Sequence, residues 1–382
     1  MFPAGLRLAL VATLVPAGLL AVDSAPRVAP TRPGLAAANQ GPAAVGKPSS
    51  LPVTRLMGLE YFVLRDVTAL LGFKSTWVES TRRLTLLDAT NRIELTGGSR
   101  EISVNGLRVF LGNPILQKGG ALFISKTDLE RCLTPLLRPA LLGPLLGRPR
   151  IIVLDPGHGG QDNGMENKPL KLKEKALTLD VAQRLKKLLE ARGYQVVLTR
   201  TDDRQLGPDK QTDFLTRADI TNRAKADLLI SIHFNSLYPD TKTSGTEVYT
   251  FTRAGQRSDR AWGAIEKDDA ETTPSEVNRF DPWSALLAHC MHREVIGTLK
   301  TFDRGQKTMH SIVLRGLKCP AVLVESVFLS NDSEARRAAT PAYLQQIAEG
   351  LASGIGAYAD LLDRISPKPT AHPAVSPSNS KS

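Results

Sequence analysis

The sequence predicts an α/β protein: a main domain over residues 150–363 with a mostly parallel sheet covered by helices on both faces, and a small α+β module at residues 51–140. Two observations predict the main domain. Short apolar runs alternate with helical stretches from Arg150 to Leu362, and polar residues directly follow several of the apolar runs. This alternation is typical of βαβ units, whose strands run parallel and bind ligands at their carboxyl ends.

The elements of the main domain follow from the spacing of apolar residues. The first strand is Arg150–Leu154, and the first long helix is Glu174–Arg192, in which leucine and valine recur at helical spacing before Gly193. The other expected strands are Tyr194–Thr199, Asp227–His233, Thr246–Phe251 and Ala321–Ser326. The other expected helices are Phe214–Lys225, Ser284–Lys300 and Pro341–Leu362.

The N-terminal module is expected to be a meander of strands bracketed by two short helices. Tyr61–Val67 leads into a helical run at Thr68–Leu71, and Phe123–Leu129 leads into Glu130–Leu137 in the same way. The last two strand candidates are separated by Asn-Gly, which is typical of a two-residue hairpin turn. The candidates are Arg83–Leu87, Arg92–Leu95, Glu101–Val104 and Leu107–Leu111. Without a histidine in this stretch, we expect a spacer or binding module rather than a metal site.

Both ends of the chain carry segments outside these domains. Arg7 precedes the apolar run Leu8–Val22, and small residues follow, which is the layout of a secretory signal peptide over residues 1–25. An uncleaved anchor is the alternative, although the run is shorter than the about 20 residues of a membrane span. Residues 26–50 predict a Pro/Ala-rich linker and 366–382 a disordered tail. We therefore expect an exported protein with no stable membrane span in its mature form.

The chain is basic, with 49 Lys and Arg against 38 Asp and Glu and a net charge of +11. A basic surface favours an anionic partner such as nucleic acid, acidic lipid or an anionic wall polymer. The alternative is a soluble protein that is basic without binding an anionic partner. Because no RNA-binding aromatic motif or zinc-finger spacing is present, we expect no nucleic-acid partner. Its odd number of cysteines, 3, argues against a disulfide framework, and the lack of a CxxC pair argues against a thiolate metal site. A disulfide between Cys290 and Cys319 is kept as an alternative.

Three motifs place metal-ligand residues at strand ends or a helix start. They are DPGHGG with His158, LKEKAL with Glu174 and SIHFNS with His233. Two neutral imidazoles and one carboxylate suit Zn²⁺ and leave a fourth position for water, as in catalytic zinc sites. Each residue also has a simpler interpretation: an exposed turn histidine, a helix-start carboxylate and a buried core histidine. Glu166 competes with Glu174, which we prefer because the long helix fixes its position.

A fourth motif, VLVESVFLSN, places Glu325 inside an otherwise apolar strand. A buried carboxylate is costly unless it is paired or used, and partial burial raises its pKa toward that of a general base. We therefore predict that Glu325 is the catalytic base; the alternatives are a fourth metal ligand or a buried ion pair with Arg315. Asp155 is expected to hydrogen-bond a ligand imidazole or to cap its turn, and Asn235 to line the site.

The remaining histidines are weaker candidates. His289 and His292 have helical spacing that could bind a metal, but they lie in an amphipathic helix, so we interpret them as surface or packing residues. His310 could reach the cleft, but we do not include it in the site.

These motifs resemble the zinc-dependent N-acetylmuramoyl-L-alanine amidases of the type-3 cell-wall amidase family. The resemblance rests on IIVLDPGHGGQDNG, LKEKALTLDVAQRL, RADITNRAKADLLISIHFNS, GTEVYTF and CPAVLVESVFLSN. It implies that His158, Glu174 and His233 hold zinc and that Glu325 is the catalytic acid and base. The implied reaction cleaves the amide between N-acetylmuramic acid and L-alanine in peptidoglycan, for wall remodelling, septum splitting or lysis. Where the family usually has Leu-Gly after this glutamate, the chain has Ser326-Val327.

Three points remain open beside this resemblance. A deacetylase or peptidase of the wall and a non-catalytic wall-binding protein are the competing functions. Residues 253–283 form a longer segment than a minimal core needs, and in some relatives such a segment blocks the cleft until a partner removes it, so a protein activator is conceivable. Residues 51–136 resemble the N-terminal-like domain of copper amine oxidases, without implying copper binding, and we expect them to position the enzyme on the wall or on a partner.

Overall fold

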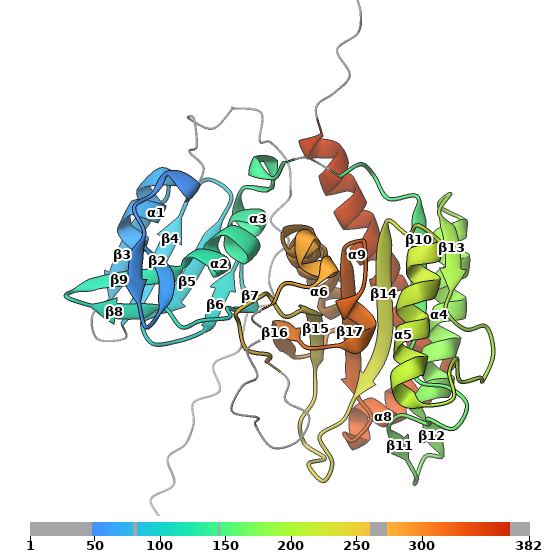
Figure 1. The fold of residues 1–382 in the computed structure, drawn as a ribbon. Helices are drawn as coiled ribbons and strands as arrows, with labels where there is room; N and C mark the ends of the chain where they lie inside the picture. Colours follow the sequence, from blue (N-terminus) through green and yellow to red (C-terminus); the bar gives the residue numbers. More distant parts are fainter. Residues whose placement is uncertain (1–47, 79–81, 144–145, 260–272, 367–382) are drawn as a thin grey trace, which may run out of the picture. The chain divides into compact units, whose positions relative to one another are not determined.

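The computed structural model describes residues 48–366 apart from 79–81, 144–145 and 260–272 (Figure 1). The expected signal peptide, almost all of the expected linker and nearly all of the expected tail therefore lie outside the described residues. Within the described part of the chain, no helix has both the length and the apolar character needed to cross a membrane.

Four parallel strands form the part of the sheet that carries the candidate site. They are β13 (Gln195–Leu198), β10 (Ile151–Pro156), β14 (Leu228–Asn235) and β17 (Ala321–Phe328), in that order. All four were predicted, and most of their apolar residues are buried, on both faces as expected for a parallel sheet.

The sheet is mixed beyond these strands. β15 (Thr246–Phe251) runs antiparallel to β17, and β16 (Asp303–Met309) runs parallel to β15. β16 was not predicted from the sequence, because its residues DRGQKTM contain no apolar run or clear alternation.

The same sheet continues into the N-terminal module. β16 pairs in parallel with β7 (Leu107–Phe110), and an antiparallel meander follows to complete 11 strands. The meander consists of β6 (Glu101–Val104), β5 (Arg92–Thr96), β4 (Arg83–Leu87) and β3 (Lys74–Val78). A second sheet has the order β1 (Thr54–Leu56), β2 (Leu59–Val63), β9 (Ala121–Ser125) and β8 (Leu116–Lys118). The module and the main domain therefore share one sheet, joined by the pairing of β16 with β7.

The helical parts of the module begin earlier than expected. α1 (Leu64–Leu70) starts four residues before the predicted run, directly after β2. The second helical segment is an irregular succession of α2 (Lys126–Asp128), a π-helical turn (Leu129–Leu133) and α3 (Thr134–Leu137). Both helical segments of the module pack into one apolar core with β5, β6 and β7.

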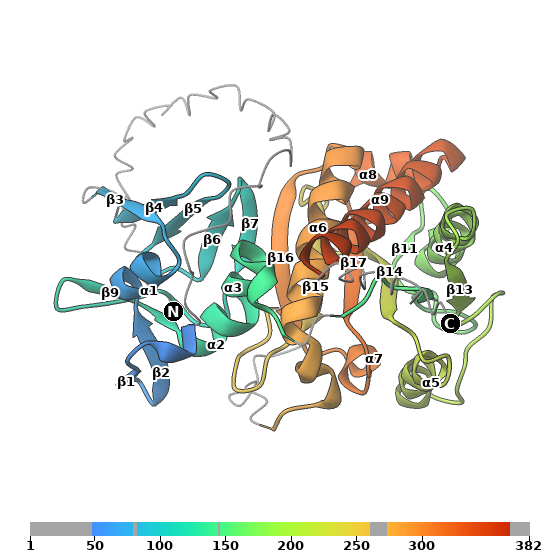
Figure 2. The same ribbon diagram turned by 90° about the horizontal axis from the view of Figure 1, so that it is seen from above.

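Helices cover both faces of the main sheet, as predicted (Figure 2). One face carries α4 (Glu174–Glu190), α6 (Asp281–Leu299) and α9 (Pro341–Ile365), which share an apolar core with Ile152 and Leu154 of β10. The other carries α5 (Lys210–Arg223) and α7 (Ile312–Arg315), which pack with Val153 and Leu229. The short α8 (Asp332–Ala338) follows β17. Cys132, Cys290 and Cys319 are buried and free, so the Cys290–Cys319 disulfide is not formed.

Buried polar contacts accompany the shared sheet. The Asp128 carboxylate of the module accepts hydrogen bonds from the backbone N–H of Gly112 at 2.6 Å and from Nε2 of Gln256 at 3.0 Å. Arg253 Nη1 lies 3.8 Å from the same carboxylate. We call Asp128, Arg253 and Gln256 the junction cluster. Arg100 and Asp259 form a further ion pair at 2.7 Å.

Candidate metal centre

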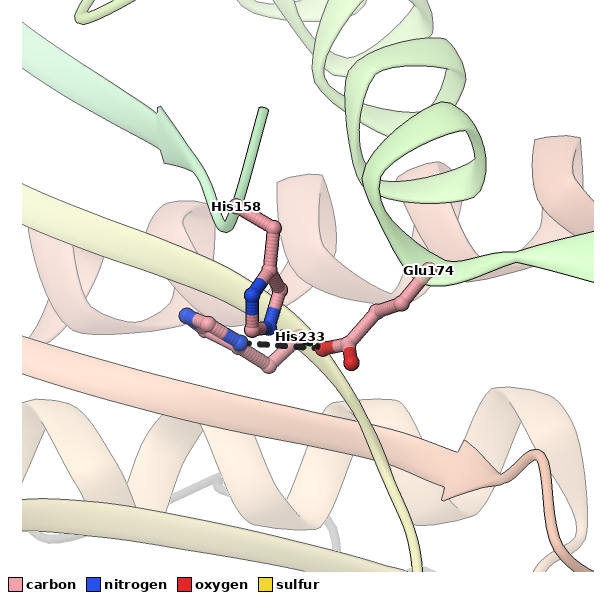
Figure 3. Close-up of side chains that lie close together, drawn as sticks. All are labelled: His158, Glu174 and His233. Atoms are coloured by element: carbon pink, nitrogen blue, oxygen red, sulfur yellow. Dashed lines mark hydrogen bonds and ion pairs between the residues drawn. The ribbon is translucent and has the colours of Figure 1, made fainter. Parts of the chain in front are cut away.

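Three side chains from distant parts of the sequence meet at the carboxyl end of the parallel strands (Figure 3). His158 follows β10, Glu174 is the first residue of α4, and His233 lies in β14. One ligand atom from each lies within 4.8 Å of the others. The Oε1 atom of Glu174 is 3.1 Å from His158 Nε2 and 3.0 Å from His233 Nδ1. We call these three residues the metal cluster.

The Glu174 carboxylate is fixed by backbone groups on both of its oxygens. Oε2 accepts a hydrogen bond from Met165 N at 2.8 Å, and Oε1 accepts one from Phe234 N at 3.0 Å. The Glu174 N–H in turn donates to the Met165 carbonyl at 2.9 Å, which joins the start of α4 to the preceding loop. Its competitor Glu166 lies exposed in the short strand β11 (Glu166–Asn167), which pairs with β12 (Leu172–Lys173), and is outside the metal cluster.

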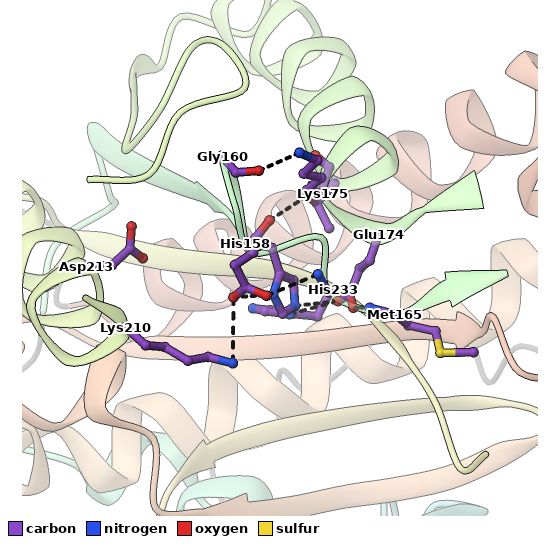
Figure 4. Close-up of polar contacts among 12 residues, drawn as sticks. His158, Gly160, Met165, Glu174, Lys175, Lys210, Asp213 and His233 are labelled. Carbon is purple, nitrogen blue, oxygen red and sulfur yellow. Dashed lines mark hydrogen bonds and ion pairs between the residues drawn. The ribbon is translucent and has the colours of Figure 1, made fainter. Parts of the chain in front are cut away.

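A tight turn orients the His158 ring. Gly159 and Asp162 exchange backbone hydrogen bonds of 2.9 and 3.1 Å, and this turn brings Asp162 Oδ2 to 2.9 Å from His158 Nδ1. Lys210 lies near the same carboxylate, with Nζ at 3.7 Å (Figure 4). A carboxylate on the far nitrogen fixes the orientation of a ligating imidazole. Asp162 was not predicted as a site residue; the feature that could have indicated it is an acidic residue four positions after His158 in the same glycine-rich turn.

The His158 backbone is held in an unusual conformation. Its φ of +64° lies in the left-handed region, which costs a non-glycine residue about 1–2 kcal/mol. Two neighbouring glycines leave the space that the cluster needs. A Cβ atom on Gly157 would lie 2.2 Å from Cε1 of His233, and one on Gly164 would lie 2.6 Å from Oε2 of Glu174. The glycines therefore permit the close approach of the ligand-bearing segments.

The electrostatics of the cluster favour a cation. Burial lowers the pKa of His158, but hydrogen bonds to Asp162 and Glu174 outweigh it and raise the pKa to about 9. Burial also raises the pKa of Glu174, but the two histidines outweigh it and hold this pKa below its usual range. The cluster is thus built for positive charge at the point where its atoms meet. Two imidazole nitrogens and a carboxylate oxygen form a donor set that fits Zn²⁺.

Glu325 lies on the strand next to His233. The parallel strands β14 and β17 place the two residues in register, and Glu325 is 3% exposed. Residues in register on neighbouring strands project from the same face of a sheet, so the Glu325 side chain lies on the face that carries the His233 ring. Glu247 of β15 is opposite Glu325 on its other side. Arg315 is an exposed residue at the end of α7.

Asp155 and Asn235 lie near the cluster in different roles. Hydrogen bonds reach the buried Asp155 carboxylate from Thr199 Oγ1 at 2.6 Å, Ser231 Oγ at 2.8 Å and Arg217 Nη1 at 2.8 Å. These bonds join Asp155 to the neighbouring strand β14, to Thr199 and to α5, and none of them involves an imidazole. Burial raises the pKa of Asp155, but Arg217 outweighs it, so the carboxyl titrates below its usual range. Asn235 is buried at the end of β14, and its Oδ1 accepts from Ser236 N at 2.8 Å.

The other histidines take no part in the cluster. His292 is buried in α6 with Nε2 2.7 Å from Asp303 Oδ1, which is the packing role predicted for it. His289 lies on the same helix, and burial lowers its pKa to about 3. The His310 ring lies 5.8 Å from the ring of Phe251. None of the three belongs to the group of residues that could share a metal among those the structure describes.

The fold and the site together define an α/β protein with a candidate catalytic metal centre at the carboxyl ends of its parallel strands. Residues 152–357, more than half of the chain, match the family described as N-acetylmuramoyl-L-alanine amidase. The chain belongs to this family. Residues 56–133 match the copper amine oxidase N-terminal domain. Both family resemblances proposed from the sequence are thereby confirmed.

Individual relatives match over the main domain. The chain is 32% identical to the germination-specific N-acetylmuramoyl-L-alanine amidase of Bacillus subtilis (strain 168) over 224 residues, 56% of this chain and 81% of that protein. It is 30% identical over 257 residues to N-acetylmuramoyl-L-alanine amidase AmiC of Escherichia coli O6:H1, covering 61% of this chain and 59% of AmiC. A crystal structure of an amidase of this name from Clostridium difficile 630 is 30% identical, with a TM-score of 0.43, and covers 56% of this chain and 98% of that one.

Proposed function

We propose that this chain is a zinc-dependent amidase that hydrolyses the amide bond between N-acetylmuramic acid and L-alanine in peptidoglycan. The observation that carries the proposal is the convergence of His158, Glu174 and His233 within 4.8 Å in a chain of the amidase family. Two imidazoles and one carboxylate leave a coordination position for water or substrate, which distinguishes catalytic from structural zinc sites.

Each residue has a role in this proposal. Zinc bound by the metal cluster would polarise the scissile carbonyl and make a water molecule more acidic. Glu325 takes the proton of the attacking water as general base, and then donates it to the leaving nitrogen of L-alanine as general acid. Asp162 holds Nδ1 of His158, so that Nε2 faces the metal position. The backbone N–H groups of Met165 and Phe234 keep the Glu174 carboxylate in place.

The products distinguish this reaction from the competing functions. Purified peptidoglycan digested by the chain should release stem peptides with a free L-alanine amine and leave muramic acid with a free lactyl carboxylate, both detectable by mass spectrometry. Release of acetate would indicate a deacetylase, and a cut between amino acids a peptidase. Binding to peptidoglycan without any product would identify a wall-binding protein and contradict the proposal.

We infer that the chain acts outside the cytoplasm, in the periplasm or cell wall. Peptidoglycan lies there, and the signal-peptide pattern of residues 1–25 supports export. N-terminal sequencing of the exported protein tests this inference. A mature chain that begins after Ala21 or Ser24 would support a cleaved leader, whereas one that begins at Met1 in the membrane fraction would support the anchor. Recovery of the protein only from the cytoplasm would contradict export.

We propose that the N-terminal module helps to hold the enzyme on the wall. Its β3 and β4 expose Lys74 and Arg83, and cations of this kind attract an anionic polymer. Deletion of the module is a poor test, because it would leave β16 as an unpaired edge strand. The double variant Lys74→Glu, Arg83→Glu in the full chain should bind sacculi more weakly than the original, and more so at low salt. Unchanged binding would contradict this role.

A protein activator is a further proposal. The CwlD amidase of Clostridioides difficile, 26% identical to this chain, has been solved in complex with the GerS lipoprotein. We propose that this chain also works with a protein partner in the wall. Full digestion of sacculi by the purified chain alone, at a rate that a cell-envelope extract does not increase, would contradict the proposal.

A further inference from the structure

Two arginines, Arg200 and Arg217, are buried directly behind the metal cluster, 2% and 1% exposed. A guanidinium keeps its charge in proteins and offers five N–H donors in a rigid fork. Burying such a group is costly unless most of its donors are used. We propose that Arg200 and Arg217 are positioning residues that hold the His158 turn and the start of α4 in the arrangement that binds zinc. The inference rests on the proposed zinc site.

Arg217 reaches from α5 to three groups around the His158 turn. Its Nη1 donates to Asp155 Oδ1 and to the Pro156 carbonyl, both at 2.8 Å, and its Nη2 donates to the His158 carbonyl at 2.7 Å. The last bond fixes the peptide group of the residue whose φ lies in the left-handed region. Nε donates to Asp213 Oδ2 at 2.6 Å, one helical turn away, which fixes the guanidinium itself.

Arg200 joins two ligand-bearing segments. Its Nε donates to the Pro156 carbonyl at 3.0 Å, and its Nη2 donates to the Gly157 carbonyl at 2.9 Å and the Lys175 carbonyl at 2.7 Å. Pro156 and Gly157 directly precede His158, and Lys175 directly follows Glu174. A single guanidinium thus fixes the spacing between the segments that carry the imidazole and the carboxylate. Burial and the neighbouring Arg217 lower the pKa of Arg200 to about 10, which leaves it charged at neutral pH.

A purely structural role would not require this distribution of contacts. Three successive carbonyls, of Pro156, Gly157 and His158, all accept from the two arginines. Buried carbonyls need a donor, and a charged fork supplies strong and directional bonds to several of them at once. Asp155 and Asp213 both form ion pairs with Arg217, and both also attract Arg200, so their two negative charges balance the two arginines without adding net charge that would repel a metal ion.

The test compares zinc affinity with folding in the full chain. In Arg217→Met and Arg200→Met, zinc affinity measured by competition with a chelator should fall about 10- to 100-fold, the range for groups that orient metal ligands. The visible spectrum of the Co²⁺-substituted protein should change, because the imidazole geometry changes. The control is Arg223→Met on the same helix, whose side chain is 68% exposed and paired with Asp219. This variant should bind zinc like the original.

Milder variants keep the test valid if the methionine variants fail to fold. Asp213→Asn retains both arginines but weakens the anchor of Arg217, so we expect a smaller loss of zinc affinity. In Arg217→Ala, added guanidinium ion should restore part of the lost affinity at concentrations that do not unfold the chain. Folded variants that bind zinc normally, with an unchanged Co²⁺ spectrum, would overturn this inference alone. An unaltered chain that binds no zinc would overturn the proposed function as well.

Discussion

The metal cluster, which is partly buried, and the junction cluster, which is fully buried, are both polar, yet their atoms are arranged differently. In the junction cluster, Asp128 is surrounded by donors: it accepts from the N–H groups of Gly112 and Asn113, from Ser125 Oγ and from Gln256 Nε2. In the metal cluster, the ligand atoms of three residues point at one another, and Asp162 and the backbone N–H groups of Met165 and Phe234 hold the His158 and Glu174 side chains in place. Convergence of ligand atoms, rather than burial of charge, distinguishes a candidate metal site from a structural contact.

Removal of a residue of the metal cluster should give the largest effect on zinc binding. His158→Ala should lose zinc altogether in a metal assay of the purified chain, because only His233 and Glu174 remain as ligands. His292→Gln removes another buried histidine outside the cluster and should retain one zinc per chain. Equal zinc content in both variants would show that the ion binds elsewhere.

Glu325 tests whether the cluster is catalytic. Glu325→Gln should retain zinc and lose turnover of peptidoglycan by about 10²- to 10⁴-fold, the contribution of a general acid–base group. Glu166→Gln is the matched control, since this carboxylate lies exposed and outside the cluster. Full activity of Glu325→Gln would remove the proposed base.

The junction cluster should show the opposite response. Asp128→Ala leaves buried N–H donors and Arg253 without their carboxylate, so the free energy of unfolding should fall by about 3 kcal/mol. Chemical denaturation measures this loss. Zinc affinity of the folded variant should stay unchanged. An Asp128→Ala protein whose free energy of unfolding is unchanged but whose zinc is lost would contradict the distinction between the two clusters.

A smaller effect is expected at Asp281, the first residue of α6, which interacts with Arg253 of the junction cluster. Burial raises the pKa of Asp281 to about 6, although Arg253 opposes the shift. The unfolded chain then releases this proton more readily, so the folded state loses stability as the pH rises from about 4 to above 6. Asp281→Asn should abolish this loss and be more stable than the original by about 1–3 kcal/mol at pH 8, with little difference at pH 3.5.

Denaturation curves at both pH values measure the Asp281 effect. Asp360→Asn, on the exposed side of α9, is the control and should show no such pH dependence. An equal stability difference at both pH values would indicate that the amide acts through packing rather than through charge.

Local patterns predicted the parts of the fold that depend on local chemistry. The strand Thr246–Phe251 was predicted with the bounds that the structure has, and β10, β14 and β17 within two residues at either end. The polar strand β16 was missed, and with it the sheet shared with the module, because pairing between β16 and β7 leaves no mark within either segment. The early start of α1 was missed because its first turn reads as a continuation of β2.

The metal-binding residues of the site were predictable from the sequence, but the residues that position them were not. His158, Glu174 and His233 stand at strand ends or a helix start, so their convergence followed from the expected topology. Arg200 and Arg217 could not be found, because they act on backbone carbonyls that only the folded chain brings near. Asp155 was expected either to bond a ligand imidazole or to cap its turn, whereas its bonds to Thr199 and Ser231 join neighbouring strands, which local sequence does not reveal.

Anomalous diffraction at the zinc edge, from crystals of the full chain grown with zinc, tests the central claim most directly. We predict one strong peak bounded by His158, Glu174 and His233, with zinc–ligand distances of about 2.0–2.2 Å. A structure in which these three side chains hold no zinc, while the ion is bound at another place or not at all, would contradict the account.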